Sequence, residues 1–271
     1  MAFKYIDIST FQGVVDFEKL KGQVDGVIIR AGYGQNNIDA QFKRNISECN
    51  RLGIPCGVYW FSYAYTEELA RKEAEYCLAA IKPYRVELPV CFDFEYDSVE
   101  KAQKNGVGVG KTLATAMCHA FCSTIEAAGY YAMNYTNKDY LNRYFDKSTL
   151  RYDIWMAVWP TNPDAAKPPI VYDAQGKPKP VGIWQYSSKG SVDGIAGNVD
   201  MDWAYKDYPA IIKAAKLNHL EDEPKVDEPW WAEAQRWVAE TGISDADRPD
   251  EPATRAQVWT MLHRMYKLLS E

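Results

Sequence analysis

Two acidic residues, Asp93 and Glu95, lie in the segment LPVCFDFEY, whose other residues are mostly apolar or aromatic. Residues two apart in a β-strand face the same side, so both carboxylates share one face while Phe92 and Phe94 share the other. If this strand lines a barrel, the acids lie at its C-terminal end, where barrel enzymes keep their catalytic groups. The alternative is a strand end exposed to solvent, which suits the apolar neighbours less well.

Acidic residues recur in two other strand-like segments. Asp7 lies in YIDIS, and Asp200 and Asp202 repeat the two-residue spacing in VDMDW. Acids from the first, fourth and last strands converge only if the sheet closes on itself, because closure makes the last strand the neighbour of the first. A closed barrel and a shared carboxylate site therefore support each other.

A cluster of carboxylates without matching histidines suits two chemistries: binding of a hard metal ion, or acid and base catalysis at a glycosidic bond. Aromatic residues favour the second, because flat rings suit the C–H faces of sugars. Eight of them fall at or near predicted strand ends: Tyr33, Tyr59, Phe61, Tyr135, Trp155, Trp159, Trp184 and Tyr186. We therefore expect a sugar-binding groove, with no metal and no other cofactor.

Close carboxylates in a partly dry pocket hold a proton unequally, because burial and a neighbouring negative charge raise the pKa of one member. We expect Glu95 to be the general acid that protonates the leaving glycosidic oxygen, a role worth roughly 10²–10⁴ in rate. Asp93 is expected to stay ionised, and either to face the oxocarbenium-like transition state or to orient a substrate group. Retention or inversion stays open, because it depends on the separation of the carboxylates.

The elements that must position these residues alternate between strand-like and helix-like over residues 1–157, as in parallel βα units with right-handed crossovers. After residue 150, three more strands are separated by stretches too rich in proline and glycine for helices. The eight predicted strands are residues 5–9, 26–33, 56–64, 88–96, 130–136, 153–159, 181–187 and 198–203. The predicted helices are residues 16–22, 39–53, 66–81 and 110–129.

This pattern predicts an α/β fold: an irregular (β/α) barrel of five βα units followed by three strands lacking helices, plus a small C-terminal two-helix module. A doubly wound open sheet is the rival, but no glycine-rich phosphate loop follows the first strand. We assign residues 1–217 to a catalytic barrel, residues 218–229 to a charged linker and residues 230–271 to the helical module. Two such helices cannot close a core by themselves, so the module needs the barrel, a second copy or a ligand.

Composition and charge argue against several classes of partner. A formal net charge of −6 without a basic run argues against nucleic acid. No apolar run approaches the ~18 residues that span a bilayer, and no signal-peptide pattern precedes the first strand, so we expect no membrane partner and synthesis in the cytoplasm. The six cysteines lie in periodic segments and are expected to be buried thiols rather than disulfides or metal ligands.

The chain resembles the glycoside hydrolase family 25 lysozymes, which cut the β-1,4 bond between N-acetylmuramic acid and N-acetylglucosamine in peptidoglycan. The resemblance covers about residues 4–210, and its six motifs are DISTFQG, AGYG, GVYWF, DFE, IWQY and VDMDW, in that order. It implies Glu95 as the acid, with Asp93, Asp7 and Asp200 as supporting carboxylates. With the aromatic positions, the expected substrate-binding set is Tyr33, Tyr59, Phe61, Tyr135, Trp155, Trp184, Gln185 and Asp202.

The resemblance also implies a substrate-assisted mechanism, in which the N-acetyl group of the substrate is the internal nucleophile and an Asp steadies it. One departure is Trp60, where many relatives carry His. Its side chain should point away from those of Tyr59 and Phe61, so we expect a small effect on the chemistry.

The C-terminal segment resembles a single, imperfect S-layer homology motif, a type of motif that attaches proteins to secondary cell-wall polymers, usually as a set of three. Its carriers are Trp231, Ala234, Trp237, Gly242, Ile243, Thr254, Arg255, Ala256 and Leu262. The Gly and Phe expected around residues 245–248 are absent. Two interpretations stay open: binding to a wall polymer, or helices that form a homodimer or cap the barrel.

An enzyme that cuts the wall and lacks a signal sequence reaches its substrate most simply through a membrane lesion, as bacteriophage endolysins do. We therefore expect an endolysin that acts on a Gram-positive wall after release from the cytoplasm. The alternatives are a host autolysin, a non-catalytic glycan-binding barrel and, less well supported, a metal-dependent hydrolase or deacetylase.

Overall fold

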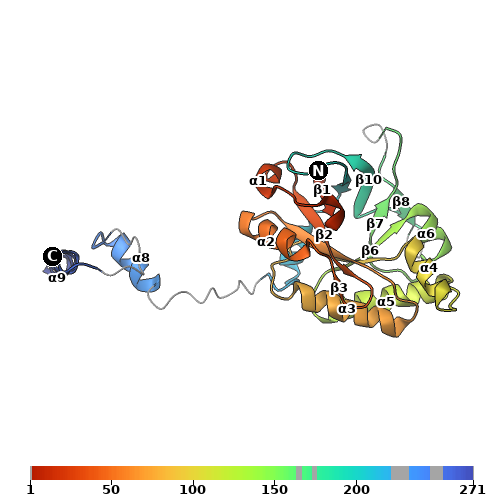
Figure 1. Ribbon diagram of the computed structural model, residues 1–271, viewed down its shortest axis with the longest axis horizontal. Coiled ribbons are helices and arrows are strands. Elements are labelled where there is room, and N and C mark those ends of the chain that lie inside the picture. Colours follow the sequence, from red (N-terminus) through yellow and green to blue (C-terminus); the bar gives the residue numbers. More distant parts are fainter. Residues whose placement is uncertain (1, 163–166, 173–175, 221–231, 245–252, 271) are drawn as a thin grey trace. The chain divides into compact units, whose positions relative to one another are not determined.

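The computed structural model describes residues 2–162, 167–172, 176–220, 232–244 and 253–270 (Figure 1). The chain divides into two compact units, Met1–Glu221 and Asp222–Glu271. The predicted linker lies outside the described residues except for residues 218–220.

The first unit is built on a closed ring of strands. They are β1 (Phe3–Ile8), β2 (Gly26–Tyr33), β4 (Cys56–Phe61), β5 (Val90–Asp93), β6 (Ala132–Asn137), β7 (Asp153–Ala157), β10 (Ile183–Gly190) and β11 (Val199–Ala204). The order around the ring is β1, β11, β10, β7, β6, β5, β4 and β2, and β2 also pairs with β1. The predicted barrel is therefore confirmed, and the open doubly wound sheet is wrong.

Strand β11 closes the ring in the direction opposite to its neighbours, because it pairs antiparallel with both β1 and β10. The other neighbouring strands of the ring pair in parallel. The register of β1 and β11 places Asp200 opposite Asp7 and Asp202 opposite Tyr5. Closure therefore brings acids from the two ends of the barrel sequence onto adjacent strands, as expected.

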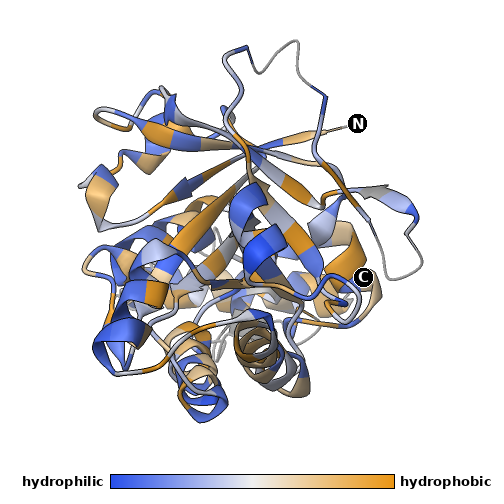
Figure 2. Ribbon diagram, turned by 90° about the vertical axis from the view of Figure 1, so that its right-hand side faces the viewer, coloured by the Kyte–Doolittle hydropathy of each residue, from blue (hydrophilic) through white to orange (hydrophobic). Residues whose placement is uncertain are grey.

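Alternation of side chains along the strands separates two apolar clusters. In β5, Val90 and Phe92 pack in the larger cluster with the buried faces of the helices. Cys91 faces the barrel interior together with Tyr5, Ile28 and other side chains of the smaller cluster. Hydrophobic residues accordingly lie along the strands in Figure 2, whereas hydrophilic residues are prominent on the helices.

Helices connect the parallel strands: α1 (Phe17–Leu20), α2 (Phe42–Leu52), α3 (Glu67–Ile81), α5 (Lys111–Ala127) and α6 (Lys138–Arg143). Helix α3 begins after Thr66, whose hydroxyl accepts the backbone N–H of Leu69 at 3.2 Å. Helix α2 ends at Gly53, which has a φ of 67°. A polar N-cap and a left-handed C-terminal glycine define these two helix ends.

The predicted helix ranges include none of α4 (Tyr96–Lys104), α6 and α7 (Tyr208–Ala214). Strand β5 ends earlier than expected, because the backbone N–H of Glu95 donates to the Ser98 hydroxyl at 3.0 Å and α4 begins directly after Glu95. Helix α7 begins where the carboxylate of Asp207 accepts the N–H of Ala210 at 3.0 Å. The last strand is thus followed by a short helix.

The remaining elements of the first unit are small: the 3-10 helix η1 (Thr10–Gln12) and strands β3 (Asn37–Ile38), β8 (Ile170–Tyr172) and β9 (Pro178–Pro180). Strands β8 and β9 form an antiparallel pair in the proline-rich connection after β7. Near the end of the unit, the side chain of Asn218 donates to the carbonyls of Val86 and Leu88, at 3.0 Å each.

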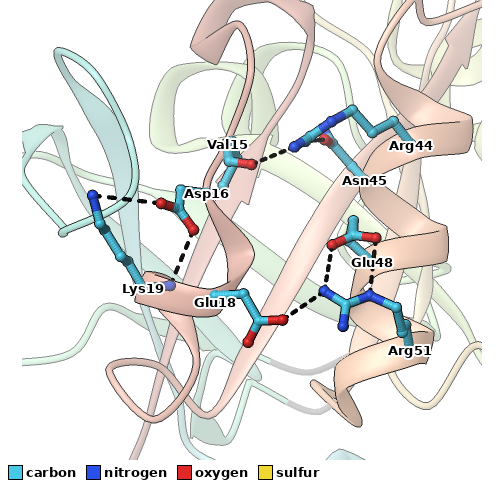
Figure 3. Close-up of polar contacts among 8 residues, drawn as sticks. All are labelled: Val15, Asp16, Glu18, Lys19, Arg44, Asn45, Glu48 and Arg51. Atoms are coloured by element: carbon cyan, nitrogen blue, oxygen red, sulfur yellow. Dashed lines mark hydrogen bonds and ion pairs between the residues drawn. The ribbon is translucent and has the colours of Figure 1, made fainter.

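Charged side chains form ion pairs on the surface of the first unit, for example between α1 and α2. Figure 3 shows Arg51 of α2 bonded to Glu18 of α1 at 2.9 Å and to Glu48 at 2.8 Å. Such exposed pairs contribute little stability, on the order of 0–1 kcal/mol each.

All six cysteines are buried free thiols. In the described parts of the chain, none of the helices combines the length and apolarity that crossing a membrane requires.

The second unit contains α8 (Ala232–Glu240) and α9 (Arg255–Ser270). Thr254 and Gln257 form a capping box: the Gln257 side chain accepts the Thr254 N–H at 2.7 Å, and the Thr254 hydroxyl accepts the Gln257 N–H at 3.2 Å. The guanidinium of Arg264 donates to the carbonyl of Ile243 at 3.0 Å. Helix α9 nevertheless leaves large apolar side chains exposed: Val258, Trp259, Leu262, Tyr266, Leu268 and Leu269.

Candidate active site

A cavity of about 250 Å³ lies at the C-terminal ends of the parallel strands. Four carboxylates line it: Asp7, Asp93, Glu95 and Asp200. The other predicted site residues that line it are Tyr59, Phe61, Tyr135, Trp155 and Gln185. The structure therefore brings most of the predicted catalytic and substrate-binding side chains to one hollow.

The carboxylates reach the cavity from separate elements. Asp7 lies near the end of β1 and Asp93 at the end of β5, whereas Asp200 lies near the start of the antiparallel β11. Glu95 is the N-cap residue of α4 and follows β5 after one intervening residue, Phe94. Phe94 packs in the apolar core with Phe92, so the alternation predicted for this segment continues past the end of the strand.

Burial raises the pKa of every carboxylate that lines the cavity. The pKa of Glu95 is raised to about 7 by its burial and by the negative charges of Asp97 and Asp200. Burial raises the pKa of Asp200 to about 6. The pKa of Asp7 lies well above its usual range because of burial, together with the charges of Asp202 and Asp200.

Asp93 differs from its neighbours in facing a positive charge. Burial and the charge of Glu95 raise its pKa, whereas the guanidinium of Arg30 lowers it. Its Oδ1 atom is buried and accepts no hydrogen bond from the described residues. An acceptor in that state is suited to a donor brought by a ligand.

Gln185 links three elements around the cavity. Its amide nitrogen donates to Asp7 Oδ2 at 2.8 Å. Its amide oxygen accepts from the Tyr135 hydroxyl at 3.3 Å and from the indole N–H of Trp159 at 3.2 Å. Gln185 is buried, and its bond to Asp7 favours the charged form of that acid. Gln185 therefore holds in place the carboxylate of Asp7 and the aromatic side chains of Tyr135 and Trp159.

Trp155 connects the cavity wall to the acid beneath it. Its ring packs edge to face against Tyr135, with centroids 4.7 Å apart, and its indole N–H donates to Asp202 Oδ1 at 2.7 Å. Asp202 is completely buried and does not line the cavity. The expectation that Asp202 contacts substrate is therefore corrected: its position on β11, opposite Tyr5, places it one layer deeper than Asp200.

Two other predicted binding residues do not line the cavity. Trp184 is buried on the opposite face of β10, where its indole N–H donates to the carbonyl of Val158 at 2.8 Å. Because Gln185 faces the cavity, its neighbours along the strand must face away. Tyr33 lies beside Arg30 at the end of β2, outside the cavity lining.

Five lining residues are absent from the predicted catalytic and binding set: Ser9, Phe11, Gln12, Arg30 and Trp159. Trp159 is one of the aromatic residues singled out at predicted strand ends. The first three belong to the turn directly after β1, within the motif that contains Asp7. Arg30 is a charged residue within an apolar strand, which is the same signal that marks Asp93 in the sequence.

The departure at Trp60 has the expected geometry. The side chain is buried, and its indole N–H donates to the carbonyl of Gly34 at 3.1 Å. Trp60 packs in the outer apolar cluster, whereas Tyr59 and Phe61 line the cavity. A different residue type at this position does not enter the cavity.

Comparison with known proteins gives a consistent result. A family model described as Glycosyl hydrolases family 25 matches residues 6–195. An autolytic lysozyme of Clostridium acetobutylicum is 25% identical over 200 residues, which is 73% of this chain and 55% of that protein.

Two solved structures share the fold. The modular autolysin LytC of Streptococcus pneumoniae, solved with a synthetic peptidoglycan ligand, is 30% identical with a TM-score of 0.61, over 75% of this chain and 47% of that one. The CTP1L endolysin is 19% identical with a TM-score of 0.63, over 99% of this chain and 100% of that one, which supports the fold alone. The chain spans about half the length of LytC and of the clostridial lysozyme.

Proposed function

The chain belongs to the glycosyl hydrolases of family 25, and from this premise we propose that it hydrolyses peptidoglycan as an N-acetylmuramidase. Its substrate is the β-1,4 bond between N-acetylmuramic acid and N-acetylglucosamine. The observation that carries the proposal is the convergence of Asp7, Asp93, Glu95 and Asp200 with aromatic rings in one cavity. Such a cavity supplies both parts of a glycosidase: acids for the bond and flat faces for the sugar rings.

Glu95 is the general acid of the proposed reaction. With a pKa raised to about 7, it still holds its proton over much of the neutral range and can pass it to the leaving glycosidic oxygen. Its position directly before α4 leaves the side chain partly buried and in contact with the cavity. Protonation of the leaving oxygen lets the sugar depart as a neutral alcohol.

Asp93 orients the acetamido group of the substrate. Its Oδ1 is buried without a donor among the described residues, so the N–H of an N-acetyl group can bond there. That bond directs the acetyl oxygen at the anomeric carbon and stabilises the positive charge that develops on the acetamido group. The N-acetyl group then acts as the nucleophile, and water opens the resulting ring with Glu95 as the base.

Asp7 and Asp200 complete the electrostatics of the proposed site. Both lie on the side of the cavity formed by the closure of β1 and β11. In their ionised forms they favour the positively charged, oxocarbenium-like transition state over the neutral ground state. Gln185 keeps the carboxylate of Asp7 in place through the 2.8 Å bond.

The experiment that tests this proposal is mass spectrometry of peptidoglycan digested with the purified chain. New reducing ends on muramic acid are expected. Reducing ends on glucosamine would place the cut at the other glycosidic bond, and intact glycan strands would favour the alternative of a non-catalytic glycan-binding barrel.

We also propose that the enzyme is an endolysin that acts on a Gram-positive wall after release from the cytoplasm, with a host autolysin as the alternative. The second unit, with its exposed apolar helix α9, is proposed to bind a secondary wall polymer or to form a homodimer. Genomic neighbours discriminate between the two origins, because lysis genes adjoin an endolysin. Sedimentation of the protein with walls stripped of secondary polymer tests the first role of the unit.

A further inference from the structure

Two exposed aromatic residues, the rim aromatics Phe11 and Trp159, line the cavity. Phe11 is 81% exposed and Trp159 is 58% exposed. Neither belongs to the two apolar clusters of the described residues. Single exposed apolar side chains are common on protein surfaces, but these two lie beside the carboxylates of the candidate active site. Their contacts therefore show whether they are placed there to meet a ligand.

The backbone around Phe11 is held by side-chain acceptors. The hydroxyl of Ser9 accepts the N–H of Phe11 at 3.2 Å, and the side chain of Gln12 accepts the N–H of Ser9 at 2.8 Å. Asp39 accepts the N–H of Thr10 at 3.1 Å. Three successive backbone N–H groups are therefore bonded, so the turn after β1 presents the ring of Phe11 in a defined place.

Arg30 supports the ring of Phe11 from one side. Its guanidinium carbon lies over that ring, 4.9 Å from the centroid. Asp39 holds the guanidinium in turn, because Asp39 Oδ2 accepts from Nε at 2.8 Å and lies 2.7 Å from Nη2. A cation over one face of an aromatic ring leaves the opposite face available to a ligand. The high exposure of Phe11 agrees with an open second face.

Trp159 is anchored by its polar edge. Its indole N–H donates to Gln185 Oε1 at 3.2 Å, and the same oxygen accepts from the Tyr135 hydroxyl at 3.3 Å. Gln185 is buried and bonded to Asp7, so this anchor is itself fixed. The hydrogen bond uses the one polar atom of the indole, and more than half of the side chain stays exposed. Both rim aromatics thus combine a fixed position with an open apolar surface, which suits stacking on a sugar ring.

The order of the strands places the rim aromatics on different parts of the ring. Phe11 follows β1 and Trp159 follows β7, and strands β11 and β10 separate them on one side. Strands β6, β5, β4 and β2 separate them on the other side. Asp200 lies on the first of these arcs, and Glu95 follows β5 on the second. A polymer that crosses the cavity from Phe11 to Trp159 therefore passes between these two carboxylates.

The volume of the cavity limits what it can enclose. It measures about 250 Å³, below the roughly 300–1,000 Å³ of pockets that enclose a drug-sized ligand. A strand of several sugars cannot lie wholly inside it, so sugars beyond the cleaved bond must contact the rim. The other exposed aromatic residues described in the first unit lie outside the cavity lining: Tyr33, Tyr96 and Tyr172.

We propose that the rim aromatics are stacking platforms for sugars on the two sides of the cleaved bond, so that the enzyme selects extended glycan strands over short fragments. The ligand of each platform is a pyranose ring with an apolar C–H face. The strand must be long enough to reach both platforms while the bond lies at Glu95. The inference rests on the proposed function, which takes the substrate to be a glycan strand.

The test measures the Kd of soluble glycan strands, freed of peptide stems and secondary polymer, for the full chain carrying Glu95→Gln to prevent cleavage. Calorimetry serves for long strands, and NMR titration for the disaccharide that contains the cleaved bond and no further sugar. Phe11→Ala is expected to raise the Kd of long strands roughly three- to tenfold, because a stacking surface is lost. The Kd of the disaccharide should stay unchanged, because this ligand does not reach the platform.

Two further variants make the test independent of one substitution. Trp159→Ala, on the other side of the cavity, is expected to show the same dependence on strand length. Phe11→Tyr keeps a flat ring and should bind long strands like the parent. An unchanged Kd for long strands in both alanine variants would overturn the proposal. An equal loss for long strands and disaccharide would also overturn it, because the rings would then act at the cleaved bond itself.

Tyr172→Ala is the matched control. Tyr172 is an aromatic residue of the first unit that is 56% exposed but lies outside the cavity lining. Its loss should change the Kd of neither ligand. Urea denaturation checks that each variant is folded, and Phe11→Ala is expected to unfold like the parent, because the exposed ring buries little apolar surface.

Kinetics of the active chain separate the platforms from the catalytic groups. Stacking beyond the cleaved bond is the same in the ground state and the transition state, so Phe11→Ala should raise KM for long strands without changing kcat. A fall in kcat at constant KM would contradict the proposal. If the parent binds strands with the expected dependence on Phe11 but cleaves none, the proposed function fails and the platforms stand. Cleavage by a parent whose binding depends on neither ring gives the reverse result.

Discussion

Asp7 on β1 and Asp200 on β11 are direct partners in the antiparallel pairing that closes the barrel. Each strand alone contributes one carboxylate, and the pairing places both at the cavity that Asp93 and Glu95 also line. The acids therefore act together only while the ring of strands is intact. A substitution can therefore disable the site in two ways, by removing a carboxylate or by disturbing the ring of strands.

Glu95→Gln is expected to lower the rate of peptidoglycan hydrolysis by at least roughly 10²-fold, because the amide cannot protonate the leaving oxygen. Binding to wall fragments should remain, since the change preserves size and the aromatic walls. Turbidity clearing and co-sedimentation measure the two properties. The control is Glu100→Gln, which changes an exposed residue of α4 paired with Lys104 at 2.6 Å. Undiminished clearing by Glu95→Gln would remove Glu95 from the mechanism.

The pH dependence of hydrolysis follows from the pKa of Glu95, which is raised to about 7. The acid must be protonated, so kcat/KM is expected to fall as the pH rises through that value, with a limit of roughly tenfold per pH unit. Rates with a soluble glycan fragment measure the profile. A rate that stays constant well above neutral pH would show that another group donates the proton.

A buried acid outside the cavity gives a prediction about stability. Glu73 of α3 is fully buried, and its carboxylate accepts the N–H of Tyr63 at 3.0 Å. Burial raises its pKa from 4.5 to about 7, so the folded state binds this proton more tightly than the unfolded state. This contribution is complete below the unfolded pKa and is lost as the pH rises through about 7.

Glu73→Gln removes that dependence. Between about pH 5 and about pH 8, the free energy of unfolding of the parent is expected to fall by up to about 3 kcal/mol more than that of the variant. Urea denaturation at the two pH values measures the difference. Equal losses in the two proteins would mean that Glu73 is not protonated in the folded state.

Trp184 and Gln185 are neighbours on β10, but substitution of the first is expected to affect stability and substitution of the second to affect catalysis. Gln185→Leu removes the 2.8 Å bond to Asp7 at the cavity, and kcat/KM is expected to fall by roughly tenfold or more. Trp184→Phe removes the bond to the Val158 carbonyl on the outer face, and is expected to cost about 1 kcal/mol of stability without a change in kcat/KM. A loss of kcat/KM in Trp184→Phe, with a loss of stability alone in Gln185→Leu, would mean that Trp184 rather than Gln185 faces the cavity.

Removal of metal ions is expected to have no effect on hydrolysis. The proposed mechanism uses protein carboxylates and the acetamido group of the substrate, so dialysis against EDTA should leave the initial rate unchanged. A loss that added Zn²⁺ or Mg²⁺ restores would favour the alternative of a metal-dependent hydrolase.

The exposed face of α9 carries the prediction for the second unit. Trp259, Leu262, Tyr266 and Leu269 follow a spacing of three, four and three residues, which places them on one side of the helix. If this side joins two copies, Leu262→Glu should convert a dimer to a monomer in analytical ultracentrifugation. Thr260→Glu is the control, because Thr260 is exposed and lies outside that spacing. A parent protein that is already monomeric would leave wall binding as the proposed role.

The sequence allows the barrel and most of the site to be predicted, because both depend on local periodicity. Alternation predicts β5 and the inward direction of Asp93, and helix ends such as Gly53 follow from local backbone preferences. Helix α4 is missed, because a single bond between the Glu95 N–H and the Ser98 hydroxyl redirects a chain whose residues suit a strand. Local bonds of this kind carry little sequence signal.

Other errors at the site concern how deeply a side chain is buried and which face of its strand it occupies, because a motif match contains neither. Asp202 lies two residues after Asp200 in the same motif but is buried one layer deeper. Trp184 is adjacent to Gln185 in another motif but lies on the opposite face of the strand. Strict alternation would have assigned Trp184 correctly. Arg30 could have been found by applying to β2 the reasoning used for Asp93. Its partner Asp39 could not, because their pairing depends on how β2 meets the start of α2 in space.

The antiparallel strand β11 is also the last strand of the ring to be synthesised. A nascent chain that ends before Val199 lacks Asp200 and leaves the edges of β1 and β10 without their partner. A chain interrupted before this strand is therefore expected to have neither a closed ring nor the complete set of four cavity carboxylates.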